Sequence, residues 1–272
     1  MPELPEVETV MRGLRPVLEG RRLARVEARR PDLRWPIPAD LRQRLTGAVV
    51  TGIRRRAKYG LIDTDRGDTM ILHLGMSGRM RVDPETDEKH DHIVIETDEG
   101  RRAVLNDARR FGSVHLVPTD DLDSHFLIKG LGPEPLGAPV DLSGFKGRFA
   151  PVKALLLDQR LIAGLGNIYV CEALFDAGVA PTREGGKVKR AELAKLAAAI
   201  PEVLERAIAA GGSTLRDYRQ VAGELGYFQH EFRVYGREGE LCPRCQHPVK
   251  RALHAGRPSF TCPRCQPEGA KA

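Results

Sequence analysis

The residue with the most distinctive chemistry is Pro2, which follows the initiator methionine. If Met1 is removed, Pro2 becomes a secondary amine, and a free α-amino group with a reference pKa near ~8 is roughly 10% neutral at pH 7. Such an amine can attack a sugar C1′ or a carbonyl carbon and form a covalent Schiff base. From a secondary amine this intermediate is an iminium whose nitrogen has no proton to lose, and its permanent charge suits elimination chemistry. Glu3 places a carboxylate beside the amine.

The residues after Pro2 predict a helix that positions the N-terminus. Pro5 suits the first turn of a helix, and the acids that follow it suit the positive end of the helix dipole. Apolar residues then recur at i, i+3, i+4 and i+7, namely Val7, Val10, Met11 and Leu14. An N-terminus tethered ahead of a buried helix is held in place. The alternative is a Met-Pro start that is merely disordered.

Composition bounds the class of protein. The chain has 272 residues, enough for one large or two ordinary domains, and its 41% hydrophobic and 29% charged residues indicate a soluble globular protein. It has no long apolar run that would predict a transmembrane helix, and its acidic first residues do not resemble a signal peptide. We therefore expect a cytoplasmic location. The net charge of +6 favours a polyanionic partner such as nucleic acid.

Four of the five cysteines form two Cys-Pro-Arg-Cys motifs separated by sixteen residues: Cys242, Cys245, Cys262 and Cys265. This spacing is typical of a tetrahedral structural zinc site. Two disulfides are the alternative, which a cytoplasmic location disfavours. Because four thiolates leave no open position on the metal, zinc-activated hydrolysis is also disfavoured. Cys171 is expected to be an ordinary, partly buried thiol.

The first half of the chain reads as β-structure. Short segments rich in β-branched residues recur, separated in several places by turn clusters, at residues 23–28, 49–53, 69–74, 93–97, 102–105 and 114–117. They predict an all-β sandwich or barrel with the N-terminal helix packed on it. Dense glycine and proline between residues 130 and 137 then indicate a linker or hinge.

The second half of the chain reads as helical. We expect a helix over residues 151–158, and a glycine turn whose Asn167 caps a second helix over 168–177, with Gly178 after its end. A longer helical stretch over 193–208 contains Pro201, which should kink or split it. Helix, glycine turn and helix form the layout of helix-turn-helix DNA readers, although such turns are frequent in helical domains.

Several short motifs occur in an order that closely resembles the bacterial formamidopyrimidine-DNA glycosylase family. They are Met-Pro-Glu-Leu-Pro-Glu-Val-Glu-Thr at the N-terminus, Arg-Ala-Lys-Tyr at 56–59, His-Leu-Gly-Met-Ser-Gly at 73–78, Lys-His-Asp-His at 89–92, Asp-Ala-Arg-Arg-Phe-Gly at 107–112, Gly-Leu-Gly-Asn-Ile-Tyr at 164–169, and the four cysteines. The resemblance runs from Pro2 to Cys265, nearly the whole chain.

The resemblance implies an α+β multidomain fold. It comprises an N-terminal β-sandwich with a packed helix (residues 1–131), a linker (132–140), a helix-two-turn-helix DNA-binding domain (141–230) and a zinc-finger β-hairpin with four cysteine ligands (231–267). DNA would lie in the cleft between the two halves. Residues 216–227, here called the capping segment, would cover the extruded base, and such segments are usually mobile without DNA.

The resemblance also implies a bifunctional DNA glycosylase and AP lyase of base excision repair that removes oxidised purines, namely 8-oxoguanine and formamidopyrimidines. Pro2 would attack C1′ of the damaged nucleotide while Glu3 supplies protons. The iminium would then undergo β- and δ-elimination, which leaves a one-nucleotide gap. Lys58 would donate the proton in β-elimination, and Arg257 would assist δ-elimination and clamp a phosphate. Without the resemblance, Lys58 and Arg257 read as ordinary surface residues.

Other residues match the family's DNA contacts. Met76, Arg109 and Phe111 would fill the void that base flipping leaves in the duplex. Met76 and Phe111 could instead be core residues, but both occur in glycine- and arginine-rich settings that are poor places to bury a side chain. The residues that would bind the DNA backbone around the lesion are His90, Arg109, Arg148, Lys153 and Asn167.

Two other functions remain open. A sister family, endonuclease VIII, shares the fold and the lyase chemistry but prefers oxidised pyrimidines; Leu4 and the complete Arg109-Arg110-Phe111 motif favour the purine-specific branch. A non-catalytic damaged-DNA-binding zinc protein is the other possibility. We expect one structural Zn²⁺, a double-stranded DNA partner with oxidised purines or abasic sites, no membrane and a monomer.

Overall fold

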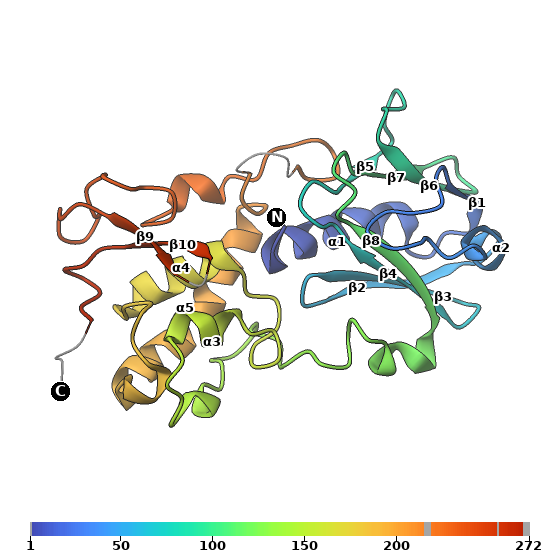
Figure 1. The fold of residues 1–272 in the computed structure, drawn as a ribbon. Coiled ribbons are helices and arrows are strands. Elements are labelled where there is room, and N and C mark those ends of the chain that lie inside the picture. The colour runs from blue at the N-terminus through green and yellow to red at the C-terminus, as the bar shows by residue number, and fades with distance from the viewer. Residues whose placement is uncertain (1, 215–218, 255, 269–272) are drawn as a thin grey trace. The chain divides into compact units, whose positions relative to one another are not determined.

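The computed structural model describes residues 2–214, 219–254 and 256–268. Its helices and strands follow one another along the chain as Figure 1 labels them. The α-helices are α1 (Leu4–Leu18), α2 (Leu41–Leu45), α3 (Val152–Leu157), α4 (Asn167–Ala177) and α5 (Arg190–Ala209). The strands are β1 (Leu23–Ala28), β2 (Val50–Arg56), β3 (Tyr59–Thr64), β4 (Asp68–His73), β5 (Arg79–Val82), β6 (Asp91–Thr97), β7 (Arg102–Asn106), β8 (Ser113–Pro118), β9 (Lys250–His254) and β10 (Arg257–Thr261). Short 3-10 turns occur at Thr119–Ser124, Ser143–Phe145, Gly185–Lys187 and Phe228–Glu231.

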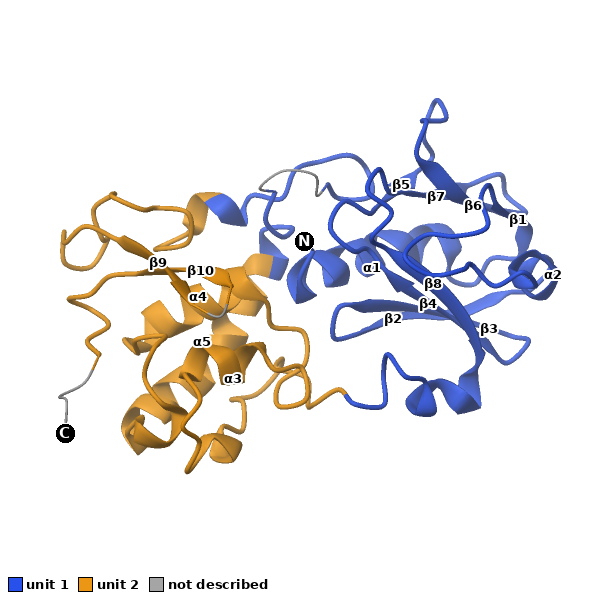
Figure 2. Cartoon of the chain, in the orientation of Figure 1, with its two compact units in different colours: residues 1–130, 208–229 blue, residues 131–207, 230–272 orange. Residues whose placement is uncertain are grey.

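The chain divides into two compact units (Figure 2). Unit 1 contains Met1–Gly130 and Ile208–Gln229, and unit 2 contains Leu131–Ala207 and His230–Ala272. The described residues of 208–229, which the sequence placed in the helical domain, are therefore grouped with the N-terminal half. The four domains expected from the sequence have other boundaries than these two units, and those boundaries stay a prediction.

Unit 1 contains two four-stranded antiparallel sheets, as expected for the β-sandwich. Their strand orders are β1-β6-β7-β5 and β2-β3-β4-β8. One hydrophobic cluster joins α1 to residues from both sheets, such as Val26 and Leu105 from the first and Ile53 and Leu72 from the second. Burial of this apolar surface holds the unit together.

Helix α1 confirms the helix expected at the N-terminus. It spans Leu4–Leu18, and its predicted apolar face, Val7, Val10, Met11 and Leu14, is at most 1% exposed. The period of the apolar residues matches the helical repeat, so a single face of α1 packs into the core. The helix that follows Pro2 is thus part of the interior of unit 1.

Two strands of unit 1 were not predicted. Residues 59–64 form β3, which the sequence left between two strand segments, and residues 79–82 form the short edge strand β5. Strand β3 carries glycine and aspartate, which are depleted in strands. It forms because it pairs with both β2 and β4 over its length.

The helices of unit 2 differ from expectation at two points. We expected Pro201 to kink or split the long helix. Helix α5 runs from Arg190 to Ala209 with Pro201 inside it, so the helix is not split, and Ile200 and Val203, close to the proline, are buried. Asn167 is the first residue of α4 and not its cap, because Gly166 occupies the cap position. Gly178 ends α4 with φ 71°, a left-handed conformation that glycine favours.

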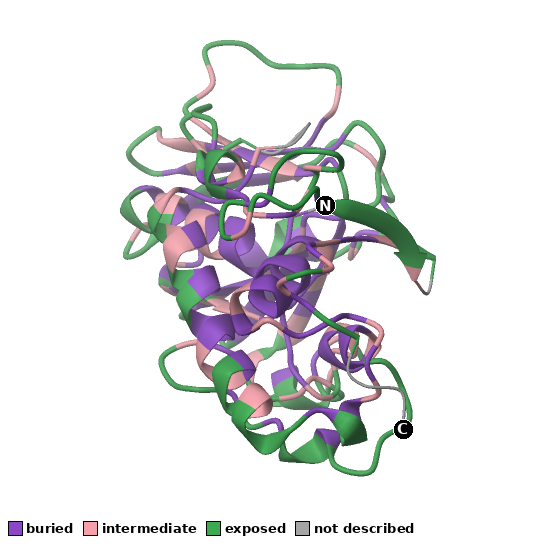
Figure 3. Cartoon of the chain, turned by 90° about the vertical axis from the view of Figure 1, so that its left-hand side faces the viewer, coloured by how far each residue is buried: buried purple, intermediate pink, exposed green. Residues whose placement is uncertain are grey.

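The C-terminal hairpin shares a core with α4. Strands β9 and β10 pair antiparallel, and a hydrophobic cluster contains Cys171 and Phe175 of α4 together with Val249 and Phe260 of the C-terminal module. Cys171 is buried, as expected for an ordinary thiol. Strand β9 is exposed along most of its length (Figure 3), so β10 supplies the buried residues of the paired strands.

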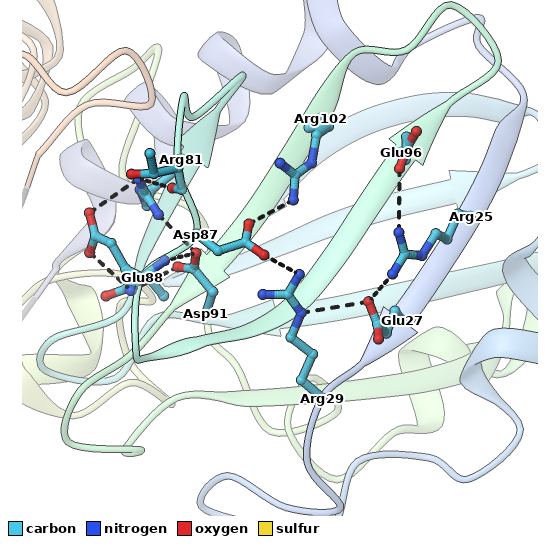
Figure 4. Close-up of polar contacts among 11 residues, drawn as sticks. Arg25, Glu27, Arg29, Arg81, Asp87, Glu88, Asp91, Glu96 and Arg102 are labelled. Atoms are coloured by element: carbon cyan, nitrogen blue, oxygen red, sulfur yellow. Dashed lines mark hydrogen bonds and ion pairs between the residues drawn. The ribbon is translucent and has the colours of Figure 1, made fainter.

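Charged side chains form a network over β1, β6, β7, β5 and the turn before β6 (Figure 4). Its buried member is Asp91, whose carboxylate accepts hydrogen bonds at 2.8 Å from Arg81 Nη1, the Glu88 backbone N–H and Asn106 Nδ2. Asp87, in contrast, is exposed and pairs with Arg29 at 2.7 Å and Arg102 at 2.9 Å. Asp91 therefore fixes the turn that carries Lys89 and His90.

This contrast yields a prediction about stability. Asp91→Ala should lower the free energy of unfolding of unit 1 by about 3 kcal/mol, because it leaves the buried Asn106 amide and two partly buried donors without their acceptor. Asp87→Ala should cost less than about 1 kcal/mol, because exposed ion pairs contribute little. Urea unfolding followed by fluorescence measures this in unit 1, since Trp35 is the single tryptophan of the chain. Equal losses in the two variants would contradict the role given to Asp91.

Candidate active site

The N-terminus is held at the first turn of α1. Pro2 is buried, and Glu3 is 4% exposed. The Glu3 backbone N–H donates to Glu6 Oε2 at 2.8 Å, and the Glu3 side chain accepts the backbone N–H of Glu6, which together form a capping box. The carboxyl group of Glu3 therefore lies at the positive end of the helix dipole, one residue from Pro2.

Glu6 also binds a second segment of unit 1. Its Oε1 accepts the backbone N–H of Ser213 at 2.8 Å, and the side chain is buried. Ser213 forms an isolated antiparallel bridge with Tyr227, at the far end of the capping segment. One carboxylate thus holds both the N-terminus and the base of the capping segment. Residues 216–218 of that segment lie outside the described residues.

Lys58 is half-buried in the turn between β2 and β3. The β2–β3 hairpin contacts α1 at two points. Arg55 pairs with Glu8 at 3.0 Å, and a Cβ at Gly60 would lie only 2.5 Å from Met11 Sδ, so that glycine allows the strand to approach the helix closely. The helix that follows the N-terminus therefore also supports the hairpin that carries Lys58.

Met76, Arg109 and Phe111 lie on two loops whose backbones touch. A Cβ at Gly75 would lie 2.3 Å from the carbonyl carbon of Phe111, and Gly75 has φ 64°, so this close approach requires glycine. Met76 is 39% exposed and Phe111 44% exposed. The Arg109 guanidinium stacks over the Phe111 ring at 4.8 Å from its centroid. The alternative of core residues is therefore wrong for Met76 and Phe111.

Asp107, which sequence reasoning did not single out, ties these loops together. It is fully buried, and its carboxylate accepts Ser77 Oγ at 2.5 Å and the Gly112 N–H at 2.8 Å. Ser77 Oγ in turn accepts the Arg109 N–H at 3.0 Å. The Asp107 N–H donates to the backbone carbonyl of His90 at 3.0 Å. The sequence did offer one signal for this role: Asp107 is an acid placed between the end of a strand and a loop with two arginines.

His73, at the end of β4, was also missed. Its Nδ1 accepts the Gly75 N–H at 3.2 Å, and its ring lies 5.1 Å from that of Tyr59. Burial, and then the positive charges of Lys58 and Arg34, lower the pKa of His73 to about 4. The ring is therefore neutral at pH 7, and its proton lies on Nε2.

In unit 2, Lys153 and Asn167 converge on β10. Lys153 is 2% exposed, and its Nζ donates to the Pro258 carbonyl at 2.8 Å and to Ser259 Oγ at 2.7 Å. Asn167 Nδ2 donates to the same Pro258 carbonyl at 2.9 Å. Burial, and to a smaller extent the charge of Arg257, lower the pKa of Lys153. Both side chains hold the strand that begins at Arg257.

The two remaining basic residues of unit 2 are exposed. Arg257 is exposed at the start of β10. Arg148 is exposed in the segment before α3, and its Nε donates to the Gly144 carbonyl at 3.2 Å. Their guanidinium groups are accessible, as phosphate ligands must be.

The four cysteines of the C-terminal module could hold a metal ion. Their sulfur atoms all lie within 4.8 Å of one another; Cys242 and Cys265 are 3.8 Å apart, and Cys245 and Cys262 are 3.4 Å apart. Tetrahedral zinc with Zn–S bonds of about 2.3 Å needs sulfur atoms about 3.8 Å apart. The donor set and its dimensions fit a closed tetrahedral site.

Comparison with known proteins follows the division of the chain. The formamidopyrimidine-DNA glycosylase N-terminal domain matches residues 1–114, and the formamidopyrimidine-DNA glycosylase H2TH domain matches residues 131–219. The formamidopyrimidine-DNA glycosylase of Rhizorhabdus wittichii is 61% identical over 272 residues, which cover 98% of this chain and 100% of that protein. The one from Novosphingobium aromaticivorans is 61% identical over 270 residues, with the same coverage.

The chain belongs to the formamidopyrimidine-DNA glycosylase family. Solved structures agree with this assignment. A complex of the Lactococcus lactis Fpg with DNA that contains an abasic site is 36% identical, covers 98% of this chain and 100% of that chain, and has a TM-score of 0.89. In this glycosylase, no helix among the described residues is long and apolar enough to cross a membrane.

The glycosylase's predicted site residues fall in both units. Pro2, Glu3 and Lys58 lie in unit 1 with His90 and the Met76, Arg109 and Phe111 loops. Arg148, Lys153, Asn167, Arg257 and the four cysteines lie in unit 2. The residues that sequence reasoning missed, Glu6, His73 and Asp107, are buried groups that position their neighbours.

The lowered pKa of His73 predicts how the stability of unit 1 depends on pH. Between pH 6.5, the ordinary pKa of histidine, and about pH 4, the pKa of His73 in the folded protein, His73 is protonated in the unfolded chain but not in the folded protein. The contribution of neutral His73 should therefore be present above pH 6.5 and decrease as the pH falls toward 4. In His73→Asn, an amide oxygen can still accept the Gly75 N–H, and this component should vanish. Urea unfolding at a series of pH values, followed by Trp35 fluorescence, measures it; parallel pH profiles for the two proteins would refute it.

Proposed function

We propose that Pro2, freed by removal of Met1, is the nucleophile of a DNA glycosylase and AP lyase of base excision repair that removes oxidised purines. The observation that carries this proposal is the N-terminus itself. Pro2 and Glu3 are buried at the start of α1, where the Glu3 N–H is bonded to Glu6. A nucleophile needs this kind of fixed position next to a proton donor.

The reaction follows from a secondary amine and an adjacent acid. The Pro2 nitrogen attacks C1′, the bond from C1′ to the base breaks, and the Pro2 amine loses its proton. The C1′–O4′ bond then breaks as Glu3 supplies a proton to O4′, which opens the sugar ring and gives the iminium. Loss of the C2′ proton from this iminium breaks the C3′–O bond, and a second elimination breaks the C5′–O bond. Lys58 donates a proton in the first elimination, and Arg257 assists the second and holds a phosphate.

DNA binding uses the exposed loops of unit 1 and the basic residues of unit 2. Met76 and Phe111 wedge into the space left by the flipped nucleotide, and Arg109 bonds the unpaired base opposite it. Their exposure on two mutually supporting loops suits this role. His90 lies on the turn that Asp91 fixes, and it contacts the DNA backbone.

Lys153 and Asn167 contribute to phosphate binding through Arg257. Both side chains donate to the Pro258 carbonyl of β10, Lys153 also donates to Ser259 Oγ, and Lys153 is almost inaccessible. They are therefore positioning residues for Arg257. Arg148 and Arg257 are exposed and contact phosphates directly. We further propose that the enzyme acts as a monomer in the cytoplasm, associated with DNA.

Borohydride trapping tests the covalent step. Reduction in the presence of abasic-site DNA should convert the iminium into a stable adduct that mass spectrometry locates at Pro2, because a secondary amine is the attacking group. Glu3→Gln should reduce base release. The intact mass must first show that Met1 has been removed. A correctly processed protein that gives no adduct would leave only a DNA-binding function.

The lesion preference is tested separately. Duplexes that contain 8-oxoguanine opposite cytosine should be cut faster than duplexes that contain thymine glycol. Preferential release of thymine glycol would favour the pyrimidine-specific function of endonuclease VIII.

We propose that the four cysteines hold one structural Zn²⁺, which would crosslink the two knuckles of the finger and supply no reactive position. Cys245→Ser should unfold the C-terminal hairpin and weaken DNA binding, because metal binding there supplies local folding energy. Unit 1 should stay folded, since its hydrophobic cluster contains no residue of the finger. Zinc content, DNA affinity and Trp35 fluorescence measure the three effects. Unchanged DNA affinity after loss of the metal would remove the finger from the binding surface.

A further inference from the structure

We propose that the contact between Gly13 of α1 and Val221 positions residues 219–224 of the capping segment and so determines how well base-bearing lesions are excised relative to abasic sites. This inference rests on the function proposed above. Val221 is partly buried and packs against the hydrophobic cluster of unit 1, although the residues that follow it, 222–225, are exposed. It is the point at which the capping segment enters the core.

Gly13 makes this contact possible. A Cβ at Gly13 would lie 2.4 Å from Val221 Cγ2, 3.3 Å from Cγ1 and 3.4 Å from the Val221 Cβ. Real side-chain carbons do not approach to 2.4 Å, so any larger residue at position 13 must displace Val221. Glycine within a helix is otherwise unfavourable. Because Gly13 has no side chain, the surface of α1 has space at this position, and Val221 occupies it.

The backbone of the same residue is bonded to the sheet. The Val82 N–H donates to the Val221 carbonyl at 2.9 Å. Val82 ends β5, which is the edge strand of its sheet, and edge strands present backbone groups that can bind another segment. Val221 is therefore fixed twice, by its side chain on α1 and by its carbonyl on β5.

The residues around Val221 form a compact turn that moves with it. The Gln220 N–H donates to the Glu224 carbonyl at 2.8 Å, and the Gly223 N–H donates to the Gln220 carbonyl at 2.9 Å. Arg219 Nη1 donates to the Gly223 carbonyl at 3.0 Å. A displacement of Val221 is thus passed to residues 219–224 as a whole.

The other attachment of the capping segment is on the same helix. Glu6 accepts the Ser213 N–H, and Glu6 and Gly13 are seven residues apart on α1. Residues at i and i+7 lie on one face of a helix. Ser213, just before the segment, and Val221, within it, therefore both contact the helix that carries the catalytic N-terminus. An extruded base needs a segment placed over it, whereas an abasic site has no base to cover.

The test compares two substrates in single-turnover assays: a duplex with 8-oxoguanine opposite cytosine and a duplex with an abasic site. Gly13→Ala should slow base release about tenfold or more and change abasic-site cleavage by less than about threefold. Gly52→Ala is the matched control in unit 1, because its added Cβ would lie 3.6 Å from Asp63 Oδ2, an ordinary contact. It should behave as the wild type on both substrates.

A second substitution should rescue the first. Val221→Ala removes both methyl groups that clash and leaves only the 3.4 Å contact of its Cβ. Gly13→Ala combined with Val221→Ala should therefore recover base release to within about threefold of Val221→Ala alone. Limited trypsin digestion gives a readout apart from activity. Cleavage after Arg219 should be faster in Gly13→Ala and return toward the Val221→Ala rate in the double variant.

Three results would overturn the inference: normal base release by Gly13→Ala, equal loss on both substrates, or failure of Val221→Ala to rescue. Should Gly13→Ala not fold, Val221→Asp tests the same contact from the capping segment, and it should lose base release while keeping abasic-site cleavage. A wild-type protein inactive on both substrates would instead refute the proposed function and not this contact.

Discussion

The site depends on one buried carboxylate, that of Glu6. Its two oxygens accept backbone N–H groups from Glu3 and Ser213, which are more than two hundred residues apart in the sequence. Glu6 is buried, and a buried carboxylate that accepts backbone donors from two distant segments holds those segments together. Because of this arrangement, the position of the proposed nucleophile and the position of the base of the capping segment both depend on the Glu6 side chain.

The sequence predicted the parts of the protein that have a local signal. Helix α1 was found because its apolar residues repeat with the helical period, and the cysteine cluster because its spacing fits a metal site. Strand β3 was missed because its glycine and aspartate oppose a strand locally, and only its neighbours on both sides make it one. Local patterns also indicated six of the strands of unit 1, whereas the α+β multidomain fold as a whole was implied by the family resemblance.

The site was predicted unevenly for the same reason. Motifs identified the exposed residues, such as Met76 and Phe111, whose types have a chemical meaning. The buried residues that support them, Asp107 and His73, have roles that arise from hydrogen bonds between distant segments. Lys153 shows the limit of reading residue type alone. The family resemblance implies that it binds the DNA backbone, which stays a prediction, and the structure adds that its ammonium group is hydrogen-bonded to Pro258 and Ser259 inside unit 2.

The C-terminal module is not independent of the helical domain. One apolar core contains Cys171 and Phe175 of α4 together with Val249 and Phe260. A zinc finger is often regarded as a module that folds on its own once it binds its metal. Here Cys242 and Cys262, two of the four proposed metal ligands, belong to the same apolar cluster as the helix. A finger transplanted from a relative would need a matching α4 surface, so the two elements are expected to change together during evolution.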